Sequence, residues 1–372
     1  MNQKISVCHL TSPHPRYDIR VFHKECVSLV KYGYKVTLIV ADGNKDEKLK
    51  GVHIVGVLKP KNKLNRLFKT TEYIYKKALE IDADIYHFHD PELILVGLKL
   101  NNRGKKVVYD VHEDLPRQLF VKKYGVFFLK KLLETALEKF ELHAASKYSA
   151  VFTVTPHIKS RFVNVNDNVD TLRNFPLLEE FSTNSVDWNR RKKEMVFVGN
   201  IIAERGIYQI VNAIEKLDIK LNICGNFSNK NLQHDVSLLP GWKKVNYHGF
   251  VGREKITEVL NESYAGLITM LPVPNFINSY PIKMFEYMAA SIPVIASDFP
   301  LFKELVEGNK CGICVNPNDS NEIAKAIKYL IDNPKEAKKM GENGRKIVLK
   351  EYNWEKESKK LSTLYQKIIK IE

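Results

Sequence analysis

Short apolar runs alternate with longer segments of helical periodicity along most of the chain. Runs rich in Val, Ile and Leu predict buried strands at Ile5–Leu10, Lys35–Val40, Val52–Val57, Ile85–Phe88, Lys106–Tyr109 and Ala150–Val154. Apolar positions with helical spacing predict helices around Arg20–Tyr32, Asn65–Leu79, Glu92–Leu100, Phe127–Lys147 and Ile158–Phe162. This alternation favours a parallel α/β sheet with helices on both faces.

A second series of the same kind follows a polar stretch at residues 181–194, which we interpret as a linker. Its expected strands are Met195–Val198, Lys220–Cys224, Val245–His248, Ala265–Thr269, Val294–Ala296 and Cys311–Val315. A chain of 372 residues also exceeds the size at which one hydrophobic core keeps growing. We therefore expect two doubly wound, Rossmann-like domains, at residues 1–180 and 195–354, with the amphipathic helix Trp354–Lys370 as the last element and residues 355–372 completing the first domain.

The turn after the first strand, Thr11–Asp18, carries no Gly-x-Gly-x-x-Gly sequence, so binding of NAD or FAD there is disfavoured. Open α/β sheets bind ligands outside the carboxyl ends of their strands. Any chemistry is therefore expected in a cleft between two such domains.

The net charge of +15 and the pI near 9.3 indicate an anionic partner. No nucleic-acid-binding signature is present, so nucleic acid is disfavoured, and an anionic membrane surface and phosphorylated substrates remain. Basic residues cluster with apolar ones at Lys59–Lys69 and Val121–Leu133. Each segment suits either a helix lying on an anionic bilayer or an ordinary surface helix with extended lysine side chains.

Five cysteines, odd in number and mostly far apart, do not form a disulfide framework. Cys311 and Cys314 have the spacing of a metal or redox pair, but without a second pair we interpret them as structural. The N-terminus has too short an apolar run for a signal peptide, and no run of about 18 apolar residues predicts a membrane span. We expect a cytoplasmic protein, either soluble or peripherally bound to the inner face of the cell membrane.

The most informative segment is Asn278–Ser297, where a polar turn opens a short helix that leads to a buried strand. It places Lys283 and Glu286 beside a helix N-terminus, which suits a phosphate, while a carboxylate one turn in can accept hydrogen bonds from sugar hydroxyls. An amphipathic helix with Phe285 and Met288 in the core explains this segment equally well. Arg205, in the loop after the second domain's first strand, favours the site, because an arginine can hold a diphosphate by bidentate hydrogen bonds.

Polar side chains also follow strands of the first domain. Asp110, His112 and Glu113 come at the end of one strand and could orient a sugar, exchange a proton or simply tie down the loop. His87 and His89 could share a metal ion with His112, but no usual metalloenzyme spacing follows, and we expect no metal.

The helix that follows the first strand begins near Asp18 and Arg20. Asp18 could cap this helix, while Arg20 could meet a phosphate or an acceptor hydroxyl, or lie exposed in the first turn.

In combination, these segments resemble a known family. Val198–Gly206, Tyr247–Phe250, Pro281–Ser297 and Glu304 look like the C-terminal half of glycosyltransferase family 4, and His14–Arg20 and Tyr109–Asp114 look like a branch that makes bacterial surface polysaccharides such as capsule and lipopolysaccharide. The resemblance implies the GT-B fold, with two domains facing across a cleft and the last helix crossing back to the first. It also implies a retaining, nucleotide-sugar-dependent enzyme that needs no cofactor or metal.

The resemblance assigns roles to matching residues. Glu286 corresponds to the acid that binds the donor ribose, Arg205 to a cation on the donor diphosphate, and His112 to a residue that contacts the transferred sugar. Gly249, Phe250 and Val251 would offer backbone contacts to the base. We place Gly199, Asn200, Asn278, Ile282 and Lys283 in the same donor site, and Arg16, Asp18, Arg20, His89, Asp110 and Glu113 on the acceptor side.

Two positions depart from the family pattern. Asn278 stands where the family often has an acid eight positions before the ribose-binding one, and Asn200 stands where an arginine commonly follows the glycine of the loop. We hypothesise that Lys283 supplies part of the missing positive charge, so that His112, Arg205 and Lys283 are the catalytic candidates.

Breaking the anomeric C–O bond toward a diphosphate needs fixed cations and amides around that leaving group. No obvious pair of carboxylates exists for a double displacement. The resemblance therefore implies same-face attack by a saccharide acceptor, which the basic, apolar surface of the first domain suggests is lipid-linked. A sugar-nucleotide epimerase of the same fold and a non-catalytic accessory protein on the membrane are the alternatives, and Asn200 and Asn278 favour the latter.

Overall fold

The computed structural model describes residues 4–114, 127–181 and 188–370. By their contacts these residues form two compact units, Met1–Asn174 with Lys356–Glu372 and Phe175–Glu355. Part of the basic segment Val121–Leu133 lies outside the described residues.

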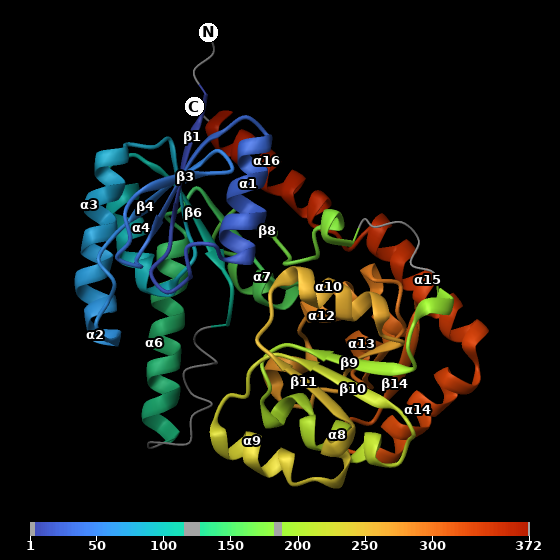
Figure 1. Ribbon diagram of the computed structural model, residues 1–372. Helices are drawn as coiled ribbons and strands as arrows, with labels where there is room; N and C mark the ends of the chain where they lie inside the picture. The colour runs from blue at the N-terminus through green and yellow to red at the C-terminus, as the bar shows by residue number, and fades with distance from the viewer. Residues whose placement is uncertain (1–3, 115–126, 182–187, 371–372) are drawn as a thin grey trace. The chain divides into compact units, whose positions relative to one another are not determined.

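The first unit is built on a sheet of eight strands (Figure 1). All neighbours in this sheet are parallel except β3, which runs antiparallel to β4 at one edge. Their order across the sheet is β3 (Glu47–Leu49), β4 (Val52–Gly56), β2 (Lys35–Val40), β1 (Ser6–Leu10), β5 (Ile85–Phe88), β6 (Lys106–Val111), β7 (Ala150–Thr153) and β8 (Val169–Thr171). The strand order reverses between β1 and β5, so ligands of such a sheet are expected beyond the carboxyl ends of these two strands.

Helices cover the sheet because parallel strands buried on both faces need apolar cover on each side. The first of them is a π-helix, η1 (Ile19–Cys26), that continues as α1 (Val27–Lys31). The others are α2 (Lys63–Asn65), η2 (Arg66–Thr70), α3 (Thr71–Ile81), η3 (Pro91–Leu93), α4 (Ile94–Asn101), α6 (Phe127–Ala145) and α7 (Pro156–Phe162).

The last helix of the chain, α16 (Trp354–Lys370), joins the first unit, as the sequence predicts. It lies beside α1 (Figure 1), where the Tyr32 hydroxyl is 3.0 Å from Ser358 Oγ. Its apolar face is buried, with Leu361, Tyr365 and Ile368 at most 2% exposed. Helical spacing of apolar residues thus predicted the buried face of this helix correctly.

The second unit contains a sheet of six strands, all parallel. Their order is β11 (Val245–Gly249), β10 (Lys220–Cys224), β9 (Glu194–Val198), β12 (Ala265–Ile268), β13 (Val294–Ser297) and β14 (Gly312–Val315). Numbered along the chain this order is 3-2-1-4-5-6, that of a Rossmann fold, and it reverses between β9 and β12.

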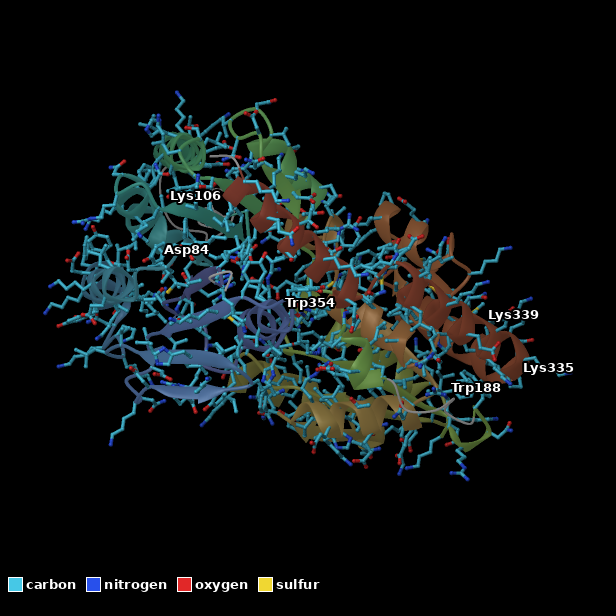
Figure 2. All side chains as sticks on the ribbon, turned by 90° about the horizontal axis from the view of Figure 1, so that it is seen from above. Asp84, Lys106, Trp188, Lys335, Lys339 and Trp354 are labelled. Atoms are coloured by element: carbon cyan, nitrogen blue, oxygen red, sulfur yellow. The ribbon has the colours of Figure 1, made fainter. Side chains whose placement is uncertain are left out.

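The helical segments of the second unit are η4 (Leu178–Phe181), η5 (Trp188–Arg190), η6 (Ala203–Arg205), α8 (Ile207–Glu215), α9 (Lys230–Ser237), η7 (Pro240–Lys244), α10 (Arg253–Glu262), α11 (Pro274–Ile277), α12 (Ile282–Ala289), α13 (Pro300–Val306), α14 (Ser320–Asp332) and α15 (Pro334–Lys350). On α15 the exposed side chains of Lys335 and Lys339, four positions apart, project away from the unit (Figure 2). Among the described residues no helix is long and apolar enough to cross a membrane.

Candidate functional site

In the second unit, the predicted donor residues gather around the point where the strand order reverses. The loop after β9 begins with Gly199, whose backbone N–H donates to the Cys224 carbonyl at the end of β10. Gly225 in turn donates to the Gly249 carbonyl at the end of β11. Three adjacent strand ends are thus linked edge to edge by their backbones, and they form one side of the candidate donor site.

Glycine is required where these backbones touch. Gly225 has a φ of 152°, and a Cβ added there would lie 1.9 Å from the Gly199 carbonyl oxygen. Gly249, with a φ of 65°, has open space where a Cβ would be, and the following Phe250 is 80% exposed. This end of β11 therefore has open space beside its backbone, where the predicted backbone contacts to a base would be made, and an exposed aromatic ring next to it.

Arg205 ends the short helix η6 and folds back onto the loop after β9. Its Nη1 donates to the Asn200 carbonyl at 3.0 Å, and a Cβ on Gly199 would lie 2.9 Å from the same nitrogen. Burial lowers the pKa of Arg205. Its Nε has no hydrogen-bond partner and, within the described ranges, no carboxylate pairs with it. A half-buried cation without a counter-ion suits an anionic ligand.

Glu286 is only 1% exposed on α12 and lies between two cations. Lys283 Nζ is 2.9 Å from its Oε2, and Arg253 Nη1 is 2.8 Å from its Oε1. Arg253 also pairs with Glu180. Three cations, Arg205 among them, and two carboxylates leave this region with an excess of positive charge.

The helix α12 is held to the strand that carries the donor loop. The Tyr287 hydroxyl accepts a hydrogen bond of 3.0 Å from the Val198 backbone N–H, at the end of β9. Tyr287 is fully buried against Gly266 of β12, where a Cβ would lie 2.1 Å from its ring. This contact fixes Glu286, the preceding residue, relative to Gly199.

Asn278 and Ile282 complete the predicted donor set. Asn278 is exposed and ends the short helix α11, and Ile282 begins α12, whose cap residue Pro281 makes no side-chain hydrogen bond. Sequence reasoning missed Arg253, although it begins the helix that follows the predicted base-binding turn at 249–251. Its position four residues after Gly249, at the start of the next helix, is the sequence signal from which it could have been selected.

In the first unit, the polar residues lie at the carboxyl ends of β1, β5 and β6. His9 pairs with His87 in register, and Val108 pairs with His87 on the other side. Side chains alternate along a strand, so His89 and Asp110, two positions further on, share the face of His87. Strand register thus brings together residues that lie up to about a hundred positions apart in the sequence.

Asp110 is the centre of this group and is fully buried. Arg20 Nη2 donates to both its carboxylate oxygens, at 2.8 and 2.7 Å, and His112 Nε2 lies 2.8 Å from Oδ2. Burial alone would raise the pKa of Asp110, but the Arg20 charge and His112 lower it well below its usual range. Asp110 is therefore an ionised carboxylate that fixes the His112 ring.

His112 differs from the other histidines of this face because its side chain is 17% exposed. Burial lowers the pKa of His112. The neighbouring Asp110 carboxylate raises that pKa, but by less, so it stays below its usual value. A neutral imidazole with one nitrogen held by Asp110 is available to a ligand at neutral pH. Glu113, the next residue, is exposed.

Four of the predicted acceptor-side residues are buried and paired within the protein instead: His89 and Asp110, and the two arginines described next. Arg16 is buried and pairs through Nε with Asp42 at 2.6 Å and through Nη1 with Glu47 at 3.0 Å. Arg20 is also buried, and it binds Glu25 as well as Asp110. Neither guanidinium is open to an acceptor, and Arg20 is not exposed in the first helical turn, because the π-helix points it into the sheet.

Asp18 caps η1, as the sequence suggests, and accepts from the backbone N–H groups of Arg20 and Val21 at 2.8 and 2.9 Å. His14 Nδ1 lies 3.4 Å from Asp18, and its Nε2 lies 3.5 Å from the buried Asp90. Burial raises the pKa of Asp90 to about 6. His14 and Asp90 belong to this strand-end group, and sequence reasoning did not select either.

The cysteines are free, and burial raises the pKa of both Cys311 and Cys314 to about 12. Cys311 Sγ contacts the backbone carbonyls of Leu305 and Val306. These features suit structural thiols, as we interpreted them from the sequence.

Comparisons with known proteins define the class. The family "Glycosyl transferases group 1" matches residues 179–347, and "Glycosyltransferase Family 4" matches residues 20–175. Together they cover most of the chain, so the protein belongs to the glycosyltransferases of family 4. It is an enzyme of the class that uses nucleotide-sugar donors.

Two relatives from Methanocaldococcus jannaschii bear the names of uncharacterized glycosyltransferases. One, MJ1607, is 22% identical over 367 residues, which are 91% of each chain. The other, MJ1178, is 26% identical over 224 residues, so the match spans only 58% of its length.

Solved structures establish the GT-B fold. Sucrose-phosphate synthase from Thermosynechococcus elongatus superposes with a TM-score of 0.78 at 15% identity, over 99% of this chain and all of its own. The Anabaena protein Alr3699/HepE, solved in complex with UDP-glucose, gives a TM-score of 0.72 at 15% identity, over 97% of this chain and 100% of its own.

Proposed function

We propose that the protein transfers a hexose from a UDP-sugar to a saccharide acceptor with retention of anomeric configuration. The observation that carries this proposal is Arg205, a half-buried guanidinium that is held by the loop after β9 and pairs with no carboxylate of the described residues. A diphosphate is a counter-ion of the right geometry for a guanidinium. UDP is the first choice of nucleotide because the solved relative Alr3699/HepE holds UDP-glucose.

In this proposal each part of the donor has a partner in the second unit. The diphosphate lies against Arg205, Lys283 and the first backbone N–H groups of α12. The ribose hydroxyls donate to Glu286, and the base stacks over the uncovered backbone at Gly249. Positive charge at the diphosphate stabilises the leaving group as the anomeric bond breaks.

His112 is the proposed contact for the transferred sugar. Its ring is fixed by Asp110 and is partly exposed, so a neutral nitrogen is available to a sugar hydroxyl. The leaving phosphate takes the acceptor proton, as the resemblance to family 4 implies. In the described donor site the carboxylates of Glu286 and Glu180 are both paired with cations, so neither is proposed as a nucleophile. Retention then follows from attack on the face that the diphosphate leaves.

The proposal is tested by a thermal-shift and turnover screen. A ligand that binds only the folded state raises the unfolding temperature. We expect UDP and one or more UDP-sugars to raise it, and NMR of the product formed with a simple acceptor to show the donor's anomeric configuration. Absence of binding and of turnover with every sugar nucleotide tried would contradict the proposal and leave the non-catalytic alternative.

We further propose that the acceptor is lipid-linked and that the first unit docks on an anionic membrane. In α2 and η2, Leu64, Leu67 and Phe68 are 68%, 46% and 67% exposed. The neighbouring Lys61, Lys63 and Lys69 are exposed as well. Exposed apolar side chains flanked by cations are the composition that binds anionic bilayers.

Vesicle cosedimentation tests the membrane proposal. The wild-type protein should bind phosphatidylglycerol vesicles and not phosphatidylcholine vesicles, and binding should fall with added salt. Phe68→Ser should weaken it at least several-fold. Leu238→Ser, a matched change at a site that is 70% exposed in the second unit, should not. Equal vesicle binding by the two variants would contradict the membrane proposal. It would leave the proposal for the donor site unaffected.

A further inference from the structure

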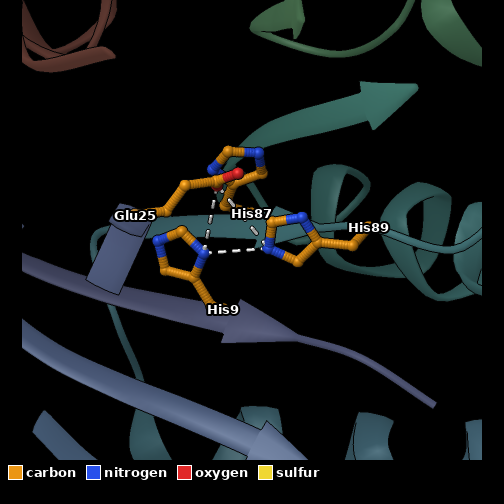
Figure 3. Close-up of side chains that lie close together, drawn as sticks. All are labelled: His9, Glu25, His87 and His89. Atoms are coloured by element: carbon orange, nitrogen blue, oxygen red, sulfur yellow. Dashed lines mark hydrogen bonds and ion pairs between the residues drawn. The ribbon is translucent and has the colours of Figure 1, made fainter. Parts of the chain in front are cut away.

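Three histidines and a glutamate converge in the core of the first unit, and burial closes His89, which we had placed on the acceptor side, to an acceptor. His9 comes from β1, His87 from β5, His89 from the end of β5 and Glu25 from η1 (Figure 3). All four are fully buried or nearly so, with exposures of at most 2%. Such a cluster is costly to bury unless each polar atom has a partner.

The distances between the four residues match those between ligands of one ion. His9 Nδ1 and His89 Nε2 share a hydrogen bond of 2.9 Å, which an ion bound to both nitrogens would replace, and each nitrogen lies 4.0 Å from Glu25 Oε2. One atom from each of the four residues lies within 4.8 Å of all the others. A tetrahedral zinc site, with bonds of about 2.1 Å, has ligand atoms about 3.4 Å apart. The separations among the His9, His89 and Glu25 atoms differ from this value by well under 1 Å.

Three of the atoms that are not candidate ligand atoms are already held, one each on Glu25, His89 and His87. Glu25 Oε1 accepts from Arg20 Nε at 3.0 Å, and His89 Nδ1 lies 3.3 Å from the Asp110 carboxylate. His87 Nδ1 lies 2.6 Å from the Tyr365 hydroxyl of α16. Outer hydrogen bonds of this kind orient the ligands of metal sites and fix their tautomers.

Two further atoms of the cluster have no such partner. Within the described residues, Glu25 Oε2 and His87 Nε2 are buried without a hydrogen bond. Buried polar atoms in folded proteins are nearly always paired, so two orphans in one cluster indicate a missing partner. The local helix type supports this, since π-helical turns occur often at functional sites, and η1 brings Arg20 and Glu25, five residues apart, onto one face.

We propose that His9, Glu25, His87 and His89 bind a Zn²⁺ ion as a closed structural site. Imidazole and carboxylate are ligands that zinc prefers, and four protein ligands leave no open position for catalysis. The ion joins β1, β5 and η1 and, through Tyr365, the last helix. This differs from our expectation from the sequence, which was that no metal is bound and which considered only His87 and His89 with His112, without His9 and Glu25. It does not depend on the proposed donor or acceptor.

Metal content of the untagged wild-type protein tests the site directly. After expression in zinc-supplemented medium and dialysis against a weak chelator, we expect about one equivalent of zinc per chain by mass spectrometry. Protein refolded with Co²⁺ should show the visible d–d absorption of tetrahedral cobalt, and a strong chelator should lower the unfolding temperature. A wild-type protein with no bound metal, no cobalt spectrum and no response to the chelator overturns the proposal.

Variants assign the ligands. His9→Gln and Glu25→Gln should each weaken zinc binding at least tenfold, and Tyr365→Phe, which removes an outer hydrogen bond, should weaken it by about tenfold or less. His53→Gln is the matched control, because His53 is exposed on β4 of the same sheet. Zinc retained at full occupancy in both ligand variants contradicts the assignment. If these variants fail to fold, the wild-type measurements decide alone.

Discussion

Lys283 Nζ lies 2.9 Å from Glu286 Oε2, one turn further along α12. The carboxylate that the sequence assigns to the donor ribose is thus in contact with the lysine assigned to the donor diphosphate. Arg253 Nη1 contacts the other oxygen of the same carboxylate at 2.8 Å. Glu286 therefore orients both cations. A substitution of any one of the three residues changes the electrostatic environment of the other two.

Glu286→Gln separates ribose binding from diphosphate binding. The amide removes an ionised acceptor for ribose hydroxyls, so affinity for UDP should fall about tenfold or more, which is about 1.4 kcal/mol. Affinity for inorganic diphosphate, which lacks ribose, should not fall, because Arg253 and Lys283 keep their charge. Calorimetry with both ligands measures this. Glu258→Gln, at an exposed position of α10, is the control, and a parallel loss for both ligands would contradict the ribose role.

Arg205→Ala should lower kcat/KM by about a hundredfold or more, because it removes a cation that no described carboxylate pairs with from beside the proposed leaving group. Lys283→Ala should have a smaller effect, since Glu286 already offsets part of that charge. Steady-state kinetics with the identified donor gives both values. Lys303→Ala is the control, because Lys303 is exposed on α13, and it should leave kcat/KM unchanged. If Lys283→Ala left donor binding unchanged while Arg205→Ala abolished it, Lys283 would not compensate for Asn200.

Gly225→Ala should destabilise the second unit by about 2 kcal/mol or more. The new Cβ would meet the Gly199 carbonyl at 1.9 Å, and a φ of 152° is strained for alanine. Thermal unfolding should show a lower midpoint, and UDP should stabilise the variant less than the wild type. Gly252→Ala provides the comparison, because that glycine has open space around its Cβ position and no positive φ. A similar fall of the unfolding midpoint in both variants would mean that the contact between the Gly225 and Gly199 loops does not cause the destabilisation.

Asp42→Asn should make the free energy of unfolding depend less on pH in the acidic range. Burial by itself would raise the pKa of Asp42, but the hydrogen bond from Arg16 lowers it to about 2, below its value of 3.8 in the unfolded chain. The unfolded state then binds the proton more readily, so the pair stabilises the fold above about pH 4 and loses that effect as the pH falls toward 2. The stabilisation is roughly 1 to 2 kcal/mol.

Urea unfolding at pH 7, 4 and 3 measures this difference. The wild-type protein should exceed Asp42→Asn in stability at pH 7, and the gap should narrow at pH 3. Asp332→Asn, which breaks an exposed pair on α14, should show little change at any pH. A gap that stays constant with pH would show that Asp42 does not titrate with a depressed pKa.

Apolar patterning predicted most of the strands because parallel strands buried on both faces read as nearly continuous apolar runs. It missed β3 (Glu47–Leu49) and β8 (Val169–Thr171), since both are short edge strands with polar residues, and edge positions do not demand apolar side chains. It also read η1 and α1 as one regular helix, because the spacing of apolar positions does not distinguish a π-helix from an α-helix over two turns.

Local sequence also identified the two strand ends that carry polar groups, and the motifs near Arg205, Glu286 and His112 predicted the class of enzyme that the comparisons confirm. These signals are local, because a turn, a helix start and a strand end lie within a few residues of each other. The order of strands in each sheet, which sets where ligands bind, followed only from the tertiary structure.

The sequence by itself therefore determined the fold class and the enzyme family, and it predicted the residue types of a donor site. Only the tertiary structure decided which charged side chains are in contact. Arg253 faces Glu286 from another helix, Arg20 turns inward to Asp110, and His9 and Glu25 join His87 and His89 through strand register and a π-helical turn. Such contacts link residues far apart in the chain, and their distances depend on how strands and helices pack, which no local pattern records.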